Sequence, residues 1–183
     1  MKFPAFFDTN VLYGAFLNDF ILELADRGLF RPLWSKDVLF ELGKNLVRNG
    51  EDPILVAKRI GTMERYFADA MVTGYEGLVP TMTNDKKDRH VLAAAVRGGA
   101  EVLVTFNTKD FPAESVERYD VEIVHPDDFL LDQLDLYHGA TLGALTDLVA
   151  NYDSPAMTID DFLISLMRAG VPRFAEAARD LLY

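Results

Sequence analysis

The chain has 183 residues, half of them hydrophobic, so it is long enough to bury a sizeable core and too apolar to be disordered. It contains no cysteine, which excludes disulfides, zinc–thiolate sites and thiol nucleophiles. Its net charge of -11 argues against a protein built to hold duplex DNA tightly, because Lys and Arg contacts to phosphate supply most of that affinity.

The chain opens with a predicted buried strand and a first helix. Residues 3–7 form a short, aromatic-rich run that ends at a polar turn, which is typical of a buried strand. A helix is expected over about residues 10–26, since large apolar side chains recur there every four residues and Gly28 supplies a stop signal.

Two further helices should follow. Ser35 is the expected N-cap of a helix that ends at the break formed by Asn49 and Gly50. Asp52 as cap, with Pro53 at the first helical position, predicts another helix that reaches about residue 72.

The middle of the chain alternates between strand and helix signals. Residues 74–83 are predicted to be a loop with a short strand at 78–79, because this stretch holds two glycines and a proline. A helix is expected at 85–96, and strands at 102–105 and 121–124. The order of strands and helices indicates a parallel sheet covered by helices.

The segment after residue 126 changes character, since no convincing strand follows. Amphipathic helices are expected at about 127–137, 139–150, 158–169 and 172–182. We therefore predict an α/β domain over residues 1–130 and a helical C-terminal extension over residues 131–183.

Several acidic residues lie where such a fold would bring them together. Asp8 directly follows the first strand, Glu41 lies inside the helix that Ser35 begins, and Asp85 and Asp88 open the helix at 85–96. Ligands of an open parallel sheet bind beyond the carboxyl ends of its strands, so Asp8 is expected at that edge and Asp85 or Asp88 can face it. Glu41 would reach it only through tertiary packing, which the sequence does not show. Asn107 and Asp110 follow the strand at 102–105 and should reach the same edge.

Separated carboxylates that converge in this way form an oxygen-ligand site for a hard divalent cation, Mg²⁺ or Mn²⁺. The candidate ligands are Asp8, Glu41, Asp85, Asp88, Asn107 and Asp110. The candidates for a catalytic role are Asp8, Glu41, Asp88 and Asp110. Thr9, Asn10 and Thr105 are expected to orient these ligands or to contact a phosphate.

Each acid also has a purely structural explanation. Asp8 and Asp85 could cap the helices that follow them, Glu41 could be a solvated helix residue, and Asp110 could brace its own turn. No single residue is diagnostic, and only the combination and its order along the chain favour a site.

That combination resembles the PIN domain family, the ribonuclease fold of VapC-type toxins. The matching segments are 6–12 around Asp8, 35–42 up to Glu41, 84–95 around Asp88, and 103–112. The resemblance covers roughly residues 3–130 and implies a three-layer α/β/α sandwich with a central parallel sheet, together with Mg²⁺- or Mn²⁺-dependent cleavage of RNA.

The resemblance also implies roles for individual residues. The first three acids of the family fall on Asp8, Glu41 and Asp88, with Asp85 as an accessory. Many relatives place Asp where this chain has Asn107, which leaves either Asp110 as the substitute acid or Asn107 as a neutral ligand. Toxins of this kind act on RNA and are silenced by a cognate antitoxin, and the resemblance makes a homodimer a reasonable expectation.

Other functions compete with a toxin nuclease. One is an RNA-processing nuclease outside toxin–antitoxin systems, and another is a non-catalytic module whose carboxylates bind a basic partner. An aspartyl phosphatase would need Asp where this chain has Asn10. A basic rim that could guide RNA to the acids consists of Lys36, Lys44, Arg48, Lys86, Lys87 and Arg89.

The sequence predicts no association with membranes. Its N-terminal apolar stretch is too short for a signal peptide, and no apolar run approaches the roughly 20 residues of a membrane span. We therefore expect a cytoplasmic protein.

Overall fold

A computed structural model describes residues 2–183 and contains a five-stranded parallel sheet. The strands are β1 (Pro4–Phe7), β2 (Arg31–Ser35), β3 (Met71–Val72), β4 (Val102–Val104) and β5 (Glu122–Val124). They lie in the order β3-β2-β1-β4-β5, and every neighbouring pair is parallel. The chain fills one side of β1 first and then the other, so the carboxyl ends of β1 and β4 flank the switch point at which such sheets bind ligands.

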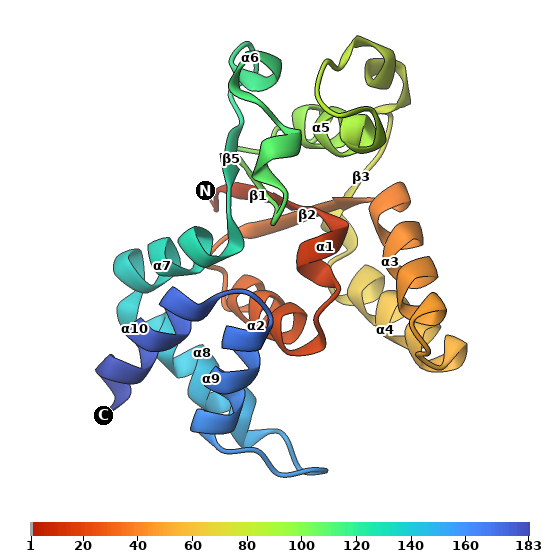
Figure 1. The fold of residues 1–183 in the computed structure, drawn as a ribbon. Coiled ribbons are helices and arrows are strands. Elements are labelled where there is room, and N and C mark those ends of the chain that lie inside the picture. Colours follow the sequence, from red (N-terminus) through yellow and green to blue (C-terminus); the bar gives the residue numbers. More distant parts are fainter. Residues whose placement is uncertain (1) are drawn as a thin grey trace.

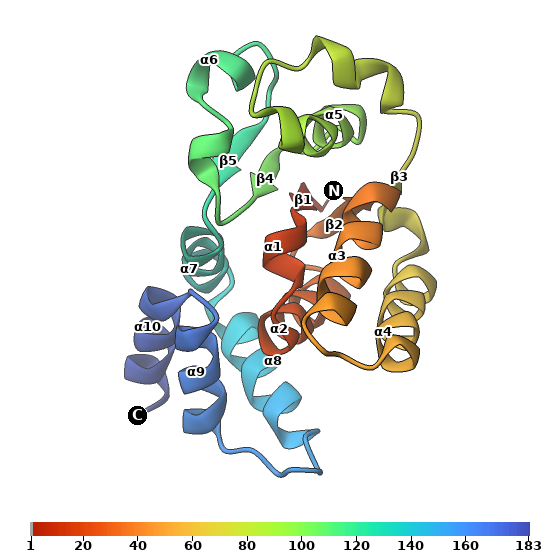
Figure 2. The same cartoon turned by 45° about the vertical axis from the view of Figure 1, so that its right-hand side comes forward.

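Helices cover both faces of this sheet, which confirms the predicted three-layer α/β/α arrangement (Figure 1). The α-helices are α1 (Thr9–Leu12), α2 (Ala15–Asp26), α3 (Lys36–Arg48), α4 (Pro53–Tyr66), α5 (Arg89–Arg97), α6 (Ala113–Val116), α7 (Pro126–Leu136), α8 (His138–Ala150), α9 (Ile159–Arg168) and α10 (Pro172–Leu182). Short 3₁₀ helices are η1 (Ala68–Ala70), η2 (Glu76–Thr81), η3 (Lys86–Asp88) and η4 (Thr108–Asp110). Helix α5 lies on one face and α2 on the other, while α3 and α4 stand as a pair beside α1 (Figure 2).

The central strands are apolar along their whole length because both of their faces are covered. Ala5, Phe6 and Phe7 of β1 are fully buried, as are Leu103 and Val104 of β4. Near-continuous apolar runs of this kind are typical of parallel strands between two helical layers.

Strand β2 was not expected from the sequence, because Pro32 lies inside it. The N–H of Arg31 donates to the carbonyl of Phe3 (2.9 Å), so the nitrogen of Pro32 faces away from β1. On that side β3 pairs only from Trp34 onwards. Pro32 therefore lies where β2 has no neighbour to receive a donor, and its missing N–H is tolerated.

The helix expected over residues 10–26 is interrupted, and α1 and α2 are separate. Gly14 adopts an extended conformation (φ -67°, ψ 121°) and is the N-cap of α2. The guanidinium of Arg59 donates to the carbonyls of Leu12 (2.6 Å) and Tyr13 (3.3 Å). Carbonyls released at the end of α1 thus gain a partner from α4, which the local sequence could not reveal.

Two further boundaries were wrong. Helix α4 ends at Tyr66, and residues 71–72 leave the predicted helix to pair with Trp34 and Ser35 as β3. The strand expected at 78–79 does not form, because those residues lie in η2. A two-residue strand has no periodicity of its own, so its existence depends on the neighbouring strand.

The helix expected over 85–96 begins as the 3₁₀ turn η3 and becomes α-helical only from Arg89. Asp85 caps this turn by accepting the N–H of Lys87 (3.1 Å). The hydrogen bonds therefore show Asp85 as a helix cap, which was its structural explanation in the sequence.

The four C-terminal helices form as predicted, and each boundary lies within one residue of the predicted one. Helices α8 and α9 pack against α2, and α7 and α10 pack against each other and against these two helices (Figure 1). Phe174 and Phe162 contact Phe20 of α2, with ring centroids 5.4 and 6.2 Å away. The predicted division between residues 130 and 131 falls inside α7, and it stays a prediction.

Within residues 2–183, every helix falls short of the length and apolar character that crossing a bilayer would require.

Candidate functional site

Asp8 is the central residue of the site, at the carboxyl end of β1. Its carboxylate is only 5% exposed and accepts from the Thr9 N–H (2.7 Å), the Thr105 hydroxyl (2.8 Å) and the Asn10 amide (3.0 Å). Burial, together with the charges of Asp88 and Glu41, raises the pKa of Asp8 to about 6, against the lowering effect of the hydrogen bonds from Thr105 and Thr9.

Asn10 and Thr105 join the ends of β1 and β4 around this carboxylate. The Asn10 amide donates to the Thr105 hydroxyl oxygen (3.2 Å), and its carbonyl oxygen accepts the N–H of Phe106 (3.1 Å). The Thr105 oxygen also accepts the N–H of Asn107 (3.1 Å). These are the contacts that a role in orienting Asp8 requires, and the role itself stays a prediction.

Glu41 reaches the site from α3. The Thr9 hydroxyl donates to Glu41 Oε2 (3.2 Å), and His90 Nε2 of α5 lies 3.2 Å from Glu41 Oε1. The close contact with His90 lowers the pKa of Glu41, against the effect of burial. Burial acts to lower the pKa of His90, but the contact with Glu41 and its charge outweigh burial, so the pKa of His90 is raised.

Asp88 and Asp110 share one ammonium group. Lys87 Nζ lies 2.9 Å from Asp88 Oδ2, 2.7 Å from Asp110 Oδ2 and 3.6 Å from Asp85 Oδ1. Burial raises the pKa of Asp88 while Lys87 opposes the rise, and the bond from Lys87 lowers the pKa of Asp110. Lys87 is therefore the counter-ion of Asp88 and Asp110.

Three of the predicted ligands line a single pocket of about 290 Å³ at the carboxyl edge of the sheet. Its lining residues are Asp8, Thr9, Asn10, Tyr13, Glu41, Asn45, Arg48, Asn49 and Asp88. Asp85, Asn107 and Asp110 lie outside this lining. As the side chains stand, residues 2–183 contain no group of three or more His, Asp or Glu that could hold a metal ion.

The sequence did not reveal several residues in or beside the pocket: Tyr13, Asn45 and Asn49 line it, and His90 contacts Glu41. His90 lies two residues after Asp88, but no spacing rule links it to Glu41 on another helix. Tyr13, Asn45 and Asn49 carried no motif, although the four-residue spacing from Glu41 through Asn45 to Asn49 was a usable signal that they share a helix face.

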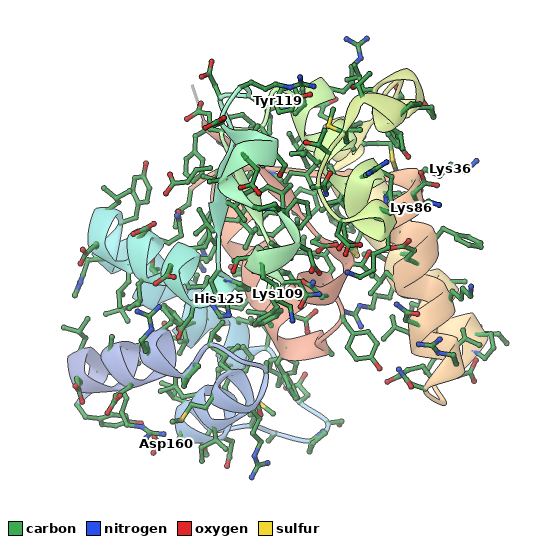
Figure 3. All side chains as sticks on the ribbon, turned by 45° about the horizontal axis from the view of Figure 1, so that its top comes forward. Lys36, Lys86, Lys109, Tyr119, His125 and Asp160 are labelled. Carbon is green, nitrogen blue, oxygen red and sulfur yellow. The ribbon has the colours of Figure 1, made fainter. Side chains whose placement is uncertain are left out.

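The predicted basic rim is only partly at the pocket. Arg48 lines both the pocket and a neighbouring groove between α3 and α4, whereas Lys36 and Lys44 line only that groove. Figure 3 shows Lys36, Lys86 and Lys109, which come from α3, η3 and η4 respectively. Basic side chains are thus present on three elements that begin at the carboxyl edge of the sheet.

Comparisons with known proteins match both halves of the chain. A family model described as "PIN domain" matches residues 4–109, and one described as "VapC50 C-terminal domain" matches residues 126–180. The first range contains every candidate ligand except Asp110.

A protein of Mycobacterium tuberculosis (strain ATCC 25618 / H37Rv), described as "Putative ribonuclease VapC50", is 49% identical over 112 residues. The similar region is 61% of this chain and 66% of that protein, so the chain spans just under two thirds of the relative. No solved structure gives a significant match.

Proposed function

The chain belongs to the PIN domain family, and from this membership we propose that it is a Mg²⁺- or Mn²⁺-dependent endoribonuclease and the toxin of a type II toxin–antitoxin pair. One observation carries the proposal. Asp8, Glu41 and Asp88 come from three distant parts of the chain and line the same pocket. A fold that needed these acids only as caps or solvated residues would have no reason to bring them together.

The donor set of this pocket fits a hard divalent cation. The carboxylate of Asp8 accepts only neutral donors and is repelled by the charges of Asp88 and Glu41. A buried carboxylate crowded by two others is stabilised either by a proton or by a bound cation. All the atoms that could ligate the metal are oxygen atoms, which favours Mg²⁺ or Mn²⁺ over softer metals.

Asp8, Glu41 and Asp88 are the residues that would hold the ion, and Asn107 or Asp110 would complete the set. Lys87 Nζ contacts carboxylate oxygens of Asp88 and Asp110, and His90 contacts Glu41. A metal ion shared by the acids would replace these two side chains in their contacts with the carboxylates.

When bound, the ion supplies a water of lowered pKa and neutralises the charge that builds up on the phosphate during cleavage. The protein's own contribution is to fix the carboxylates. Thr105 and Asn10 hold one oxygen of Asp8, the Thr9 N–H holds the other, and the Thr9 hydroxyl holds Glu41. No side-chain nucleophile is required.

The test is cleavage of a single-stranded RNA by the full chain, in EDTA and in Mn²⁺, for the wild type, Asp8→Asn and Asp180→Asn. Asp180 is an exposed acid on α10 and makes the control charge-matched. We expect cleavage only with Mn²⁺, a loss of at least about 100-fold in Asp8→Asn, and no change in Asp180→Asn. Cleavage that survives in Asp8→Asn would refute the assignment.

Thermal unfolding of the same proteins provides an independent readout. Millimolar Mn²⁺ should raise the melting temperature of the wild type and of Asp180→Asn by a few degrees, because it binds only the folded site. Asp8→Asn should respond weakly. A wild-type curve that is indifferent to Mn²⁺ would contradict the metal site even if RNA were cleaved.

The toxin assignment is supported by the name of the relative and by the second family model. A partner surface is available in the groove of about 780 Å³ between α3 and α4, where Phe40 is 69% exposed. Its rim of Lys36, Lys44 and Arg48 suits an antitoxin segment that is apolar on one face and acidic at its edges.

We place this activity in the cytoplasm, where RNA and an antitoxin would both be present. Expression of the chain should arrest growth, and co-expression of a small protein encoded beside it should relieve the arrest. Cleavage without growth arrest would instead favour an RNA-processing nuclease, and neither cleavage nor arrest would favour a non-catalytic interaction module. A homodimer stays a prediction.

A further inference from the structure

The acid pocket has a second wall that the proposed chemistry does not use. It consists of Tyr13, just after α1, and of Asn45, Arg48 and Asn49 at the end of α3. We call these four residues the α3 wall. We infer that the α3 wall binds the nucleotide next to the scissile phosphate of a single-stranded RNA, and this inference rests on the proposed function.

The helix geometry makes the wall continuous with the acids. Glu41, Asn45 and Asn49 are four residues apart and Arg48 is three past Asn45, so all four lie on one face of α3. Leu42 is fully buried and belongs to a different face. Arg48 lies about 10 Å along the helix axis from Glu41, so a strand held at the acids has a defined surface beside it.

Arg48 gives this surface its affinity for phosphate. It is the one Lys or Arg that lines the pocket, its side chain is exposed, and no carboxylate among the described residues lies within ion-pair distance of it. A free guanidinium binds a phosphate through two parallel hydrogen bonds. Because the protein is strongly acidic, a phosphate beside three carboxylates needs such a local cation.

Tyr13 is held in place for contact with a base. The Asn49 amide donates to its hydroxyl oxygen (2.7 Å), and Arg59 donates to its backbone carbonyl (3.3 Å). The half-buried ring is thus fixed from both ends before any ligand arrives. A base can stack on such a ring whatever its identity, and the amide of Asn45 can donate to or accept from a base edge.

The competing explanation of Arg48 is structural, since a basic residue in the last turn stabilises a helix through the helix dipole. The chain contains a matched control for this effect. Arg168 is also exposed in the last turn of its helix, α9, but it does not line the pocket. Arg48→Gln and Arg168→Gln therefore remove the same charge from equivalent helix positions.

The experiment measures binding of a fluorescent single-stranded RNA octamer of mixed sequence by anisotropy, at several salt concentrations. All variants are made in the full-length Asp8→Asn chain with Mg²⁺ present, so that the RNA stays intact. The variants are Arg48→Gln, Tyr13→Leu and Arg168→Gln, and circular dichroism checks that each is folded.

Arg48→Gln should weaken binding about tenfold and reduce the slope of log K against log salt by about 0.7, the loss of one phosphate contact. Tyr13→Leu should weaken binding about fivefold or more without a change in the slope, because stacking is not ionic. Arg168→Gln should change neither quantity. Equal effects of the two arginine substitutions, or a wild-type wall that binds no RNA, would overturn the inference.

Failure of the subsite can be told apart from failure of the proposed function. If the wild type cleaves RNA with Mn²⁺ but Arg48→Gln binds normally, the nuclease stands and the subsite is refuted. If no RNA is cleaved but binding depends on Arg48 and Tyr13 as described, the α3 wall binds single-stranded RNA, and the nuclease is refuted together with a position beside a scissile phosphate. A duplex competitor that displaces the octamer as well as a single strand would refute base stacking on Tyr13.

Discussion

Asp8 shows that capping and ligation are not alternatives for a single carboxylate. It accepts the Thr9 N–H as the N-cap of α1, and it is also the central acid of the pocket. Asp85 caps a turn in the same way but remains about half exposed and outside the pocket. What distinguishes the two residues is burial and the hydroxyl of Thr105, and both depend on where β4 lies.

The raised pKa of Asp8 predicts how stability depends on pH when metal is absent. Between its ordinary value of 3.8 and its folded value of about 6, the folded state binds more protons at Asp8 than the unfolded state does. The stability of the wild type therefore falls as pH rises through this window, by up to about 3 kcal/mol from this residue. Asp8→Asn removes the titrating group and so should be more stable at high pH.

Urea unfolding in EDTA tests this prediction. Relative to the wild type, Asp8→Asn should gain about 1–3 kcal/mol at pH 8 and almost nothing at pH 4. Asp180→Asn, at an exposed position, should show no such difference. An Asp8→Asn variant that is less stable than the wild type at pH 8 would contradict the assigned burial cost.

Among the elements, α10 is held by a cap that comes from another helix. Its own N-cap residue, Val171, offers no side-chain acceptor. Instead the buried carboxylate of Asp127, in the first turn of α7, accepts the N–H groups of Arg173 (3.1 Å) and Phe174 (2.8 Å). Two orphan donors of α10 are thereby satisfied across 46 and 47 residues of chain.

Removing this cap should destabilise the protein. Asp127→Ala leaves two N–H groups of α10 without their acceptor and should cost about 2 kcal/mol. Asp128→Ala is the control, because Asp128 is half exposed and pairs only with the exposed side chain of Arg173, which predicts a cost below about 1 kcal/mol. Equal costs in urea unfolding at pH 7 would show that the cap does not stabilise the helix junction.

At the scale of the whole molecule, the C-terminal helices complete the core of the α/β part. Phe129 of α7 packs edge-on against Phe7 of β1 (5.5 Å between ring centroids) and against Phe30 (5.1 Å). Phe3 also contacts it, at 6.3 Å. The strand that carries Asp8 is therefore packed against α7, whose Phe129 lies before the predicted division at residues 130 and 131.

This packing predicts one cooperative unfolding transition. Phe129→Ala should cost about 3–5 kcal/mol, because it leaves a cavity among the rings of Phe3, Phe7 and Phe30. Phe40→Ala, at a side chain that is 69% exposed, should cost within about 0.5 kcal/mol. Trp34 is the single tryptophan and lies buried in β2, so its fluorescence reports on the sheet while far-UV circular dichroism reports largely on the helices.

Coincident curves from the two probes, shifted together by Phe129→Ala, are the expected result. Two separate transitions, with Phe129→Ala affecting only the helical signal, would instead show that α7 and the helices after it unfold independently of the sheet.

Local pattern predicted the elements that have a strong period or a clear cap. The aromatic run of β1, the helix after Ser35 and the four C-terminal helices were all predictable for this reason. Strands β2 and β3 were not, because one contains a proline and the other has only two residues, and each forms through pairing with a neighbour. The break between α1 and α2 at Gly14 was not predicted for a similar reason, because Arg59 of another helix stabilises it.

By itself, the sequence determined which acids this protein has, their order along the chain and the strands and helices that carry them, because those depend on residues close together. Only the tertiary structure decided that Asp8, Glu41 and Asp88 line one pocket, that Lys87 lies between Asp88 and Asp110 while His90 lies beside Glu41, and that the end of α3 forms a second wall. Contacts of this kind join segments separated by tens of residues. Their energy comes from packing and charge in three dimensions, which no local spacing encodes.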